Sequence, residues 1–443
     1  MLTAISPIDG RYESKTAILS DYFSEHALIK YRVRVELLYL IELSQLGLKN
    51  LPALTRRQTE LLNRTLDNYQ VEDSQKIKEI EATTNHDVKA VEYYIKDILE
   101  ANDMSEIKEF VHFGLTSQDI NNTALPLMLK DAMHDVVLPL LDQVIQVIEG
   151  LAKDFRGIPM LAKTHGQPAT PTTLGKEFLV YAERLSIQKG QLSTYKLRAK
   201  FGGATGNLNA HKVTYPDTDW IAFADRFIQS MDLERMEYTT QIAHYDEMSY
   251  IFDLLKRIST ILIDLCQDIW SYISMEYFKQ KTVKGEIGSS TMPHKVNPID
   301  FENAEGNLKY ANAIFNFLSE KLPVSRLQRD LTDSTVGRNI GVPIAHAVIA
   351  YKSLLKGMSK LLLNQEAIDR DLNRNWAVVA EAIQSILRRE KYPNPYEALK
   401  ELTRGKANIG EADIKDFIET LDVADDIKVE LSAISPFNYI GYF

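Results

Sequence analysis

Apolar residues recur at intervals of three and four through most of the chain between about residues 125 and 365. This spacing places them on one face of a helix. Five runs show it, bounded by Leu129 and Leu151, Phe178 and Leu192, Ile251 and Ile269, Leu308 and Leu318, and Ile344 and Leu362. No sustained alternation of period two lies between them, and long helices of this kind pack as an up-and-down bundle. The sequence therefore predicts an all-α fold with an elongated central helical bundle.

Shorter helical patterns flank the five runs. Residues 31–46 and 57–69 form two of them, and polar or glycine- and proline-containing breaks interrupt the pattern near the other end of the chain. We expect an N-terminal helical domain over 1–110, the long-helix bundle over 111–363 and a C-terminal helical domain over 364–443. Several central helices are apolar on more than one side, which indicates either packing between subunits or contact with the terminal domains.

Charge and cysteine content limit the function. With 51 basic and 61 acidic residues the chain carries a net charge of −10, whereas nucleic acid and anionic membranes attract a positive surface. Any anionic ligand must therefore meet a local cluster of cations. The only cysteine, Cys266, excludes an intrachain disulfide and a cysteine-rich zinc site, and it fits a reducing compartment. We find no secretory signal and no long apolar segment, so we expect a soluble cytoplasmic protein.

Two stretches of small and polar residues, 163–171 and 285–298, interrupt the helical pattern. Such loops between rigid helices are where a site is expected. In the first, His165 could act as a general acid or base near neutral pH, although a histidine that only caps a helix end is commoner. In the second, the amides through Ser290, with Lys295 beside them, could bind an anion. A serine-rich connector is the alternative reading of this second stretch.

The second stretch resembles the signature of the fumarase and aspartase superfamily, whose members release fumarate from a succinyl compound. His294 stands where fumarases typically have glycine and argininosuccinate lyases typically have glutamine. Within the superfamily, five motifs are similar to the adenylosuccinate lyase family. They read TTNHDVKA at 83–90, FGLTSQD at 113–119, THGQPATP at 164–171, SSTMPHKVNPIDFEN at 289–303 and SRLQRDLTDS at 325–334. The resemblance runs from SPIDGRY at 6–12 to NYIG at 438–441, nearly the whole chain.

The resemblance implies a carbon–nitrogen lyase of purine biosynthesis. It would release fumarate from adenylosuccinate, leaving AMP, and from succinyl-aminoimidazole carboxamide ribonucleotide. The proton removed is weakly acidic, so the reaction needs a strong base and cations that stabilise the developing charge. The resemblance assigns the base to Ser289, with Lys295 as the nearest cation, and the general acid to His165, with Glu302 as its carboxylate partner. A histidine base, and a merely solvated Glu302 in the first turn of a helix, are the alternatives.

Further positions follow from the same motifs. His86 is expected to assist His165 or to contact the substrate phosphate. Arginine forks match phosphate oxygens, although many arginines only form surface ion pairs. The candidate phosphate-binding residues are Arg11, Tyr12, Arg329, Ser334 and Arg338, with Lys89 as a further cation. The other substrate-binding positions are Asn85, Asp87, Thr116, Ser117, Gln241, Ser290, Val296, Asn297 and Asn303. No role is carried onto His244, because the sequence departs there from the pattern of close relatives.

The motifs lie far apart in the sequence, and helices that rise about 1.5 Å per residue would separate them by tens of ångströms. The resemblance implies a homotetramer in which each active site takes loops from three chains. No metal or other cofactor is expected, because a proton-transfer elimination requires none and the nine histidines show no zinc-protease spacing. Two alternatives remain, another fumarate-releasing lyase of the superfamily and a non-catalytic helical scaffold. A scaffold would have no need of Ser289, His165, Lys295 and Glu302 together.

Overall fold

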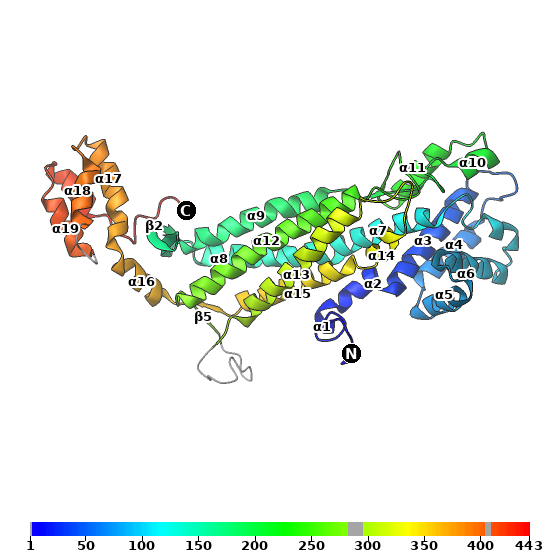
Figure 1. The fold of residues 1–443 in the computed structure, drawn as a ribbon, viewed down its shortest axis with the longest axis horizontal. Coiled ribbons are helices and arrows are strands. Elements are labelled where there is room, and N and C mark those ends of the chain that lie inside the picture. Colours follow the sequence, from blue (N-terminus) through cyan, green and yellow to red (C-terminus); the bar gives the residue numbers. More distant parts are fainter. Residues whose placement is uncertain (1, 282–295, 404–408) are drawn as a thin grey trace. The chain divides into compact units, whose positions relative to one another are not determined.

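The computed structural model describes residues 2–281, 296–403 and 409–443. Helices dominate these residues, and the strands that they contain form three short two-stranded sheets (Figure 1). The predicted all-α fold is therefore confirmed. No helix in the described ranges is long and apolar enough to cross a membrane.

Packing divides the chain into two units, each assembled from separate stretches of sequence. Unit 1 consists of Met1–Leu141, Gln188–Thr260 and Asn307–Ala350, and unit 2 of Asp142–Ile187, Ile261–Gly306 and Tyr351–Phe443. Five helices contribute residues to both units, namely α8 (Leu138–Asp154), α9 (Leu174–Thr194), α12 (Asp246–Ser274), α13 (Ile299–Lys321) and α15 (Gly341–Met358). The division into three domains stays a prediction.

The five apolar runs lie in these long helices, with two local differences. The first run is interrupted by a π-helical turn over Met133–Val137, between α7 (Ser117–Ala132) and α8. This wider turn comes just before Pro139, which has no N–H to donate and crowds the preceding turn. The fifth run ends beyond its helix, because Leu362 belongs to a strand that pairs with a second strand after α12.

Unit 1 is built around α3 (Glu25–Ser44), which begins where the Ser24 hydroxyl accepts a hydrogen bond from the amide of Ala27 at 3.0 Å. Side chains on several sides of α3, such as Val33, Val35 and Leu37, are fully buried, and α3 packs against α6 and α7. The other elements are α1 (Glu13–Thr16), α2 (Ser20–Phe23), α4 (Arg56–Asp67), α5 (Val71–Thr84), α6 (Asp87–Ala101), α10 (Asn209–Thr214), α11 (Trp220–Ser230), α14 (Thr332–Gly337), and the parallel pair β3 (Arg198–Ala199) and β4 (Glu234–Arg235).

Unit 2 contains two antiparallel strand pairs and a group of short helices. The strands are β1 (Pro159–Thr164) with β2 (Gln167–Thr173), and β5 (Phe278–Gln280) with β6 (Leu361–Leu363). The helices are α16 (Gln365–Arg374), α17 (Ala380–Arg389), α18 (Pro395–Thr403), α19 (Glu411–Glu419) and α20 (Asp425–Ser432). Buried residues such as Ile383, Ile414 and Leu431 give these helices an apolar core of their own. This agrees with a helical C-terminal region.

Candidate active site

The stretch around His165 forms a β-hairpin rather than an irregular loop. Thr164 pairs with Gln167, so His165 and Gly166 alone make the turn. Both have positive φ angles, 54° and 73°, as a two-residue turn of type I′ requires. Glycine adopts this conformation without strain, and histidine adopts it more readily than most other residues. The hairpin therefore presents His165 at an exposed tip, while its base at Thr172 and Thr173 is buried.

The predicted partner of His165 lies on α13 in the same unit. Glu302 is exposed, and its Oε1 accepts a hydrogen bond from Nε1 of Trp270 at 3.2 Å. No hydrogen bond or ion pair joins Glu302 to His165 within the described part of the chain. The pairing of the two residues therefore stays a prediction.

The loop that carries the predicted base falls largely outside the described residues, as do Ser289, Ser290 and Lys295. The residues on either side of it are joined, because Nε2 of Gln280 donates to the carbonyl oxygen of Val296 at 3.1 Å. The predicted Asn297 is the next residue after Val296. Asn303, one residue after Glu302, accepts a hydrogen bond from Oγ of Ser353 on α15 at 2.9 Å.

The turn between α5 and α6 carries another group of predicted site residues. Asn85 has a left-handed conformation, φ 51°, which ends α5, and His86 then caps α6. Nδ1 of His86 accepts from the amide of Lys89 at 3.1 Å. A neutral His86 therefore carries its proton on Nε2, which points a donor away from the helix end. The ammonium of Lys89 lies 2.8 Å from the carboxylate of Glu92.

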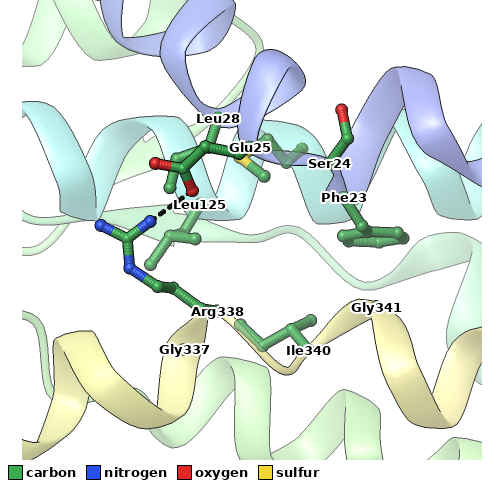
Figure 2. A pocket seen from close by; sticks show the side chains of 10 residues that line it. Phe23, Ser24, Glu25, Leu28, Leu125, Gly337, Arg338, Ile340 and Gly341 are labelled. Carbon is green, nitrogen blue, oxygen red and sulfur yellow. Dashed lines mark hydrogen bonds and ion pairs between the residues drawn. The ribbon is translucent and has the colours of Figure 1, made fainter. Parts of the chain in front are cut away.

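Asp87 connects two arginines in unit 1. Its Oδ2 lies 2.7 Å from Nη2 of Arg32 and 3.1 Å from Nη2 of Arg338. Burial alone would raise the pKa of the Asp87 carboxyl, but Arg32 and Arg338 hold that pKa below its ordinary value. The other terminal nitrogen of Arg338 donates to the carboxylate of Glu25, and both residues line a pocket of about 90 Å³ (Figure 2). Nε of Arg32 donates to Asn121 on α7 at 2.8 Å.

A third arginine, Arg329, contacts two of the neighbouring predicted residues. Nη1 of Arg329 donates to Oε1 of Gln241, and its Nη2 donates to Oγ of Ser334, both at 3.3 Å. Ser334 also accepts from Nε2 of Gln118 at 3.1 Å. Ser334 and Arg338 lie one helical turn apart at α14, so the two arginine clusters are adjacent. Gln118 directly follows the predicted Thr116 and Ser117 at the start of α7.

Arg11 and Tyr12, the predicted site residues nearest the N-terminus, lie at the edge of the arginine clusters. The guanidinium carbon of Arg11 lies 6.0 Å from the ring centroid of Tyr12, and the amide of Tyr12 donates to the carbonyl of Pro7 at 2.9 Å. Asp9 and Glu13, on either side of this pair, line a second pocket together with Arg338. The N-terminal turn therefore lies near Arg338, although Arg11 makes no hydrogen bond or ion pair with the residues around Arg329 and Arg338 in the described part of the chain.

Several residues of these clusters were missed by the sequence analysis. Arg32 is a charged residue on a buried helix face, and only that unusual position could have indicated it. Gln118 and Asp333 lie inside the motifs but carry no chemical signal of their own. Asp333 accepts a hydrogen bond from the hydroxyl of Tyr245 at 2.9 Å, and Tyr245 in turn accepts one from Asn122 at 2.6 Å. These buried contacts connect α7 and α14 to Tyr245, the residue that precedes α12. Among the described residues, no three His, Cys, Asp or Glu side chains are grouped to hold a metal ion.

Comparison with known proteins supplies the family. The chain matches the family described as Lyase over residues 10–313 and the one described as Adenylosuccinate lyase C-terminal over residues 325–440. It is 58% identical to the adenylosuccinate lyase of Dictyostelium discoideum over 450 aligned residues, which cover 99% of this chain and 97% of that protein. The chain belongs to the adenylosuccinate lyase family. The resemblance in the five motifs is thereby confirmed, and with it the assignment to the lyases.

Further relatives of the same family include the adenylosuccinate lyase of Escherichia coli (strain K12), which is 50% identical over 99% of this chain and 97% of its own length. More distant proteins share the fold. The crystal structure of a fumarate lyase from Mesorhizobium sp. BNC1 has a TM-score of 0.75 at 17% identity, covering 96% of this chain and 95% of that one. A 3-carboxy-cis,cis-muconate lactonizing enzyme from Pseudomonas putida also has a TM-score of 0.75, at 19% identity and with 97% and 95% coverage.

Proposed function

We propose that the chain splits adenylosuccinate into AMP and fumarate, and splits succinyl-aminoimidazole carboxamide ribonucleotide in the same way. The observation that supports this most is the 58% identity to an adenylosuccinate lyase over 97% of that protein's length. The motifs that carry the chemistry are present in this chain, including those around His165 and Ser289.

The arginine clusters of unit 1 supply the cations that an acidic protein needs to bind a nucleotide. Arg329 is fixed by Gln241 and Ser334, and Arg338 is fixed by Asp87 and Glu25. The planar guanidinium group of an arginine can donate two parallel hydrogen bonds to two oxygens of one phosphate. We assign the substrate phosphate to these two arginines, with Arg11 and Tyr12 as further contacts from the nearby N-terminal turn.

The elimination itself requires one base and one acid. In our proposal Ser289 removes the proton from the carbon beside a carboxylate of the succinyl group, and Lys295 stabilises the ionised serine and the developing negative charge. As the carbon–nitrogen bond breaks, His165 donates a proton to the leaving nitrogen. Glu302 holds the protonated imidazole of His165, and His86 assists it with Nε2.

We further propose a homotetramer whose active sites combine loops from three chains, located in the cytoplasm. The exposed tip at His165 supports sharing, because a projecting hairpin can reach a neighbouring copy. The long helices also expose large apolar side chains, which favours burial between subunits. They include Leu179, Val180 and Ile187 on α9, Trp270 on α12, and Tyr310 and Phe317 on α13.

A spectroscopic assay tests the substrate assignment. The purified protein is mixed with adenylosuccinate, and the ultraviolet spectrum is followed while the purine base changes and fumarate forms. Argininosuccinate, at the same concentration, is the matched control. We expect conversion of adenylosuccinate alone. Conversion of argininosuccinate instead would assign the chain to another lyase of the superfamily, and a folded protein that converts neither would contradict the proposal.

A further inference from the structure

The hairpin that carries His165 is attached to the C-terminal part of unit 2 through three side chains. Lys163 makes an ion pair at 2.8 Å, and Thr173 makes a hydrogen bond at 2.8 Å. Thr170, which lies between these two residues in the sequence, makes a further hydrogen bond. Their partners are the carboxylate of Asp371 for Lys163, the carboxylate of Glu381 for Thr170, and the carbonyl oxygen of Phe443 for Thr173. Residues far along the chain therefore fix both strands of the hairpin.

The contact nearest to the tip is the ion pair between Lys163 and Asp371. Lys163 lies two residues before His165 and is paired with Pro168. From Thr164 to Ala169, no side chain makes a hydrogen bond or ion pair with another part of the described chain. The strand register is also broken between Leu161 and Lys163. A hairpin can bend at such an irregularity. The ion pair therefore holds the hairpin just beyond the point where the backbone ladder is weakest.

Asp371 is itself well fixed before it meets the hairpin. Its Oδ1 accepts from Nδ2 of Asn375 at 3.2 Å, and its Oδ2 accepts from the hydroxyl of Tyr277 as well as from Lys163. Tyr277 is almost fully buried. The side chains of Lys163 and Asp371 are only 26% and 24% exposed. Such a pair is shielded from solvent more than the average surface ion pair, which contributes little.

From this arrangement we infer that Asp371 is a positioning residue for the reaction and that, through Lys163, it fixes the hairpin tip at which His165 acts. The inference rests on the proposed role of His165 as general acid. It gives the C-terminal helices a function in the elimination, although none of them carries a catalytic group. A displacement of about 1 Å at a reacting group can lower the rate by up to about 100-fold. We therefore expect the loss in kcat, because substrate binding depends on the arginine clusters of unit 1.

The test uses Asp371→Asn, which keeps the shape of the side chain and removes its charge. The matched control is Asp369→Asn on the same helix, whose carboxylate accepts from Nε2 of Gln365 at 2.7 Å. Lys163→Met removes the pair from the other side and decides the question if Asp371→Asn does not fold. We expect kcat to fall about tenfold or more in Asp371→Asn and in Lys163→Met, with KM within about twofold. The kcat of the double variant should be no lower than the kcat of either single variant, because the two substitutions remove the same contact.

Hydrogen exchange of the backbone amides in residues 159–173 provides a second readout. Exchange should be faster in Asp371→Asn and unchanged in Asp369→Asn. Four results would overturn the inference: unchanged kcat, unchanged exchange, losses that multiply in the double variant, or an equal change in kcat and KM with loss of the assembly. The last would indicate a merely structural role. Failure of the proposed function is a different result, since the unmodified protein would then not consume adenylosuccinate.

Discussion

Asp87 and Arg338 are 251 positions apart in the sequence, and their side chains meet at 3.1 Å. The carboxylate of Asp87 also binds the buried Arg32, so Arg338 is attached to the interior of unit 1. Arg338 and Glu25 line a pocket, and the guanidinium of Arg338 donates a hydrogen bond to the carboxylate of Glu25 (Figure 2). This arrangement fixes the direction of one cation of the proposed phosphate site.

Arg338→Lys should therefore raise KM for adenylosuccinate by about 10-fold to 100-fold, with a smaller effect on kcat. A lysine retains the charge but cannot bind Asp87 and a phosphate with a planar fork. Steady-state kinetics measure the effect. The control is Arg326→Lys, which changes an arginine that is 79% exposed and paired with Asp330 at 3.0 Å. Equal KM values for the two variants would exclude Arg338 from the phosphate site.

The buried ion pair between Asp119 and Lys200 should be essential for stability. Both side chains are 0% exposed, and Oδ1 of Asp119 lies 2.7 Å from Nζ of Lys200. Asp119 also accepts from the amides of Gly202 and Gly203 at 2.8 and 3.1 Å. Asp119→Asn leaves a buried ammonium without its counter-charge, so the free energy of unfolding should fall by about 3–5 kcal/mol.

Urea unfolding at fixed protein concentration measures this loss. Glu60→Gln serves as the control, because its partner Arg56 is 93% exposed, and it should change the free energy of unfolding by less than about 1 kcal/mol. Similar values for the two variants would show that the Asp119 carboxylate is dispensable.

His211 should make the stability depend on pH. Burial lowers the pKa of His211 to about 4, and its Nδ1 is buried with no hydrogen-bond partner among the described residues. The unfolded chain, in which the pKa is near 6.5, therefore binds more protons than the folded chain between these values. The contribution of His211 to the free energy of unfolding is fully present above about pH 6.5. It is lost as the pH falls toward 4, and the loss is roughly 3 kcal/mol.

The variant His211→Gln isolates this contribution. Glutamine keeps a donor for the hydroxyl of Tyr39, which lies 2.9 Å from Nε2 of His211, but does not titrate. The free energy of unfolding is measured between pH 7.5 and pH 4.5 for both proteins. The unmodified protein should lose more stability over this range than the variant. Parallel curves would mean that His211 does not titrate on unfolding.

Gly166→Ala should lower kcat while the protein stays folded with only a small loss of stability. A Cβ at Gly166 meets no atom within 4 Å, so the cost is confined to its positive φ of 73°. We expect a loss of about 1 kcal/mol in stability and a fall in kcat of about tenfold, because the turn that presents His165 changes shape. Thermal unfolding and steady-state kinetics measure the two effects.

Gly157→Ala is the control for this substitution, since Gly157 also has free space around it but no positive φ. An unchanged kcat in Gly166→Ala would show that the geometry of the tip does not limit the reaction.

The sequence allowed the helices to be predicted because their signal is local. The apolar spacing of three and four recurs inside α9, α12, α13 and α15, whatever these helices pack against. The hairpin at His165 was not predicted. Its strands are short, contain Pro168 and Pro171, and have a broken register, so no alternation of period two is visible. The two-residue turn with Gly166 was the signal available for it.

The substrate-binding residues could be chosen from the motifs, but their arrangement could not. Asp87 is 55 residues from Arg32 and 251 residues from Arg338 in the sequence. Only the packing of α3, α6 and α14 brings these side chains together. Ser289 and Lys295 lie outside the described residues, and the pairing of Glu302 with His165 depends on the proposed assembly.

The most direct test of the account is complementation between two inactive variants, His165→Ala and Ser289→Ala. Each is purified, the two are mixed, dissociated and reassembled, and fumarate release from adenylosuccinate is measured. Shared sites predict that mixed tetramers regain a substantial fraction of the activity, because some sites receive an intact His165 from one chain and an intact Ser289 from another. Mixed tetramers that stay inactive, with their composition verified by native mass spectrometry, would contradict the account.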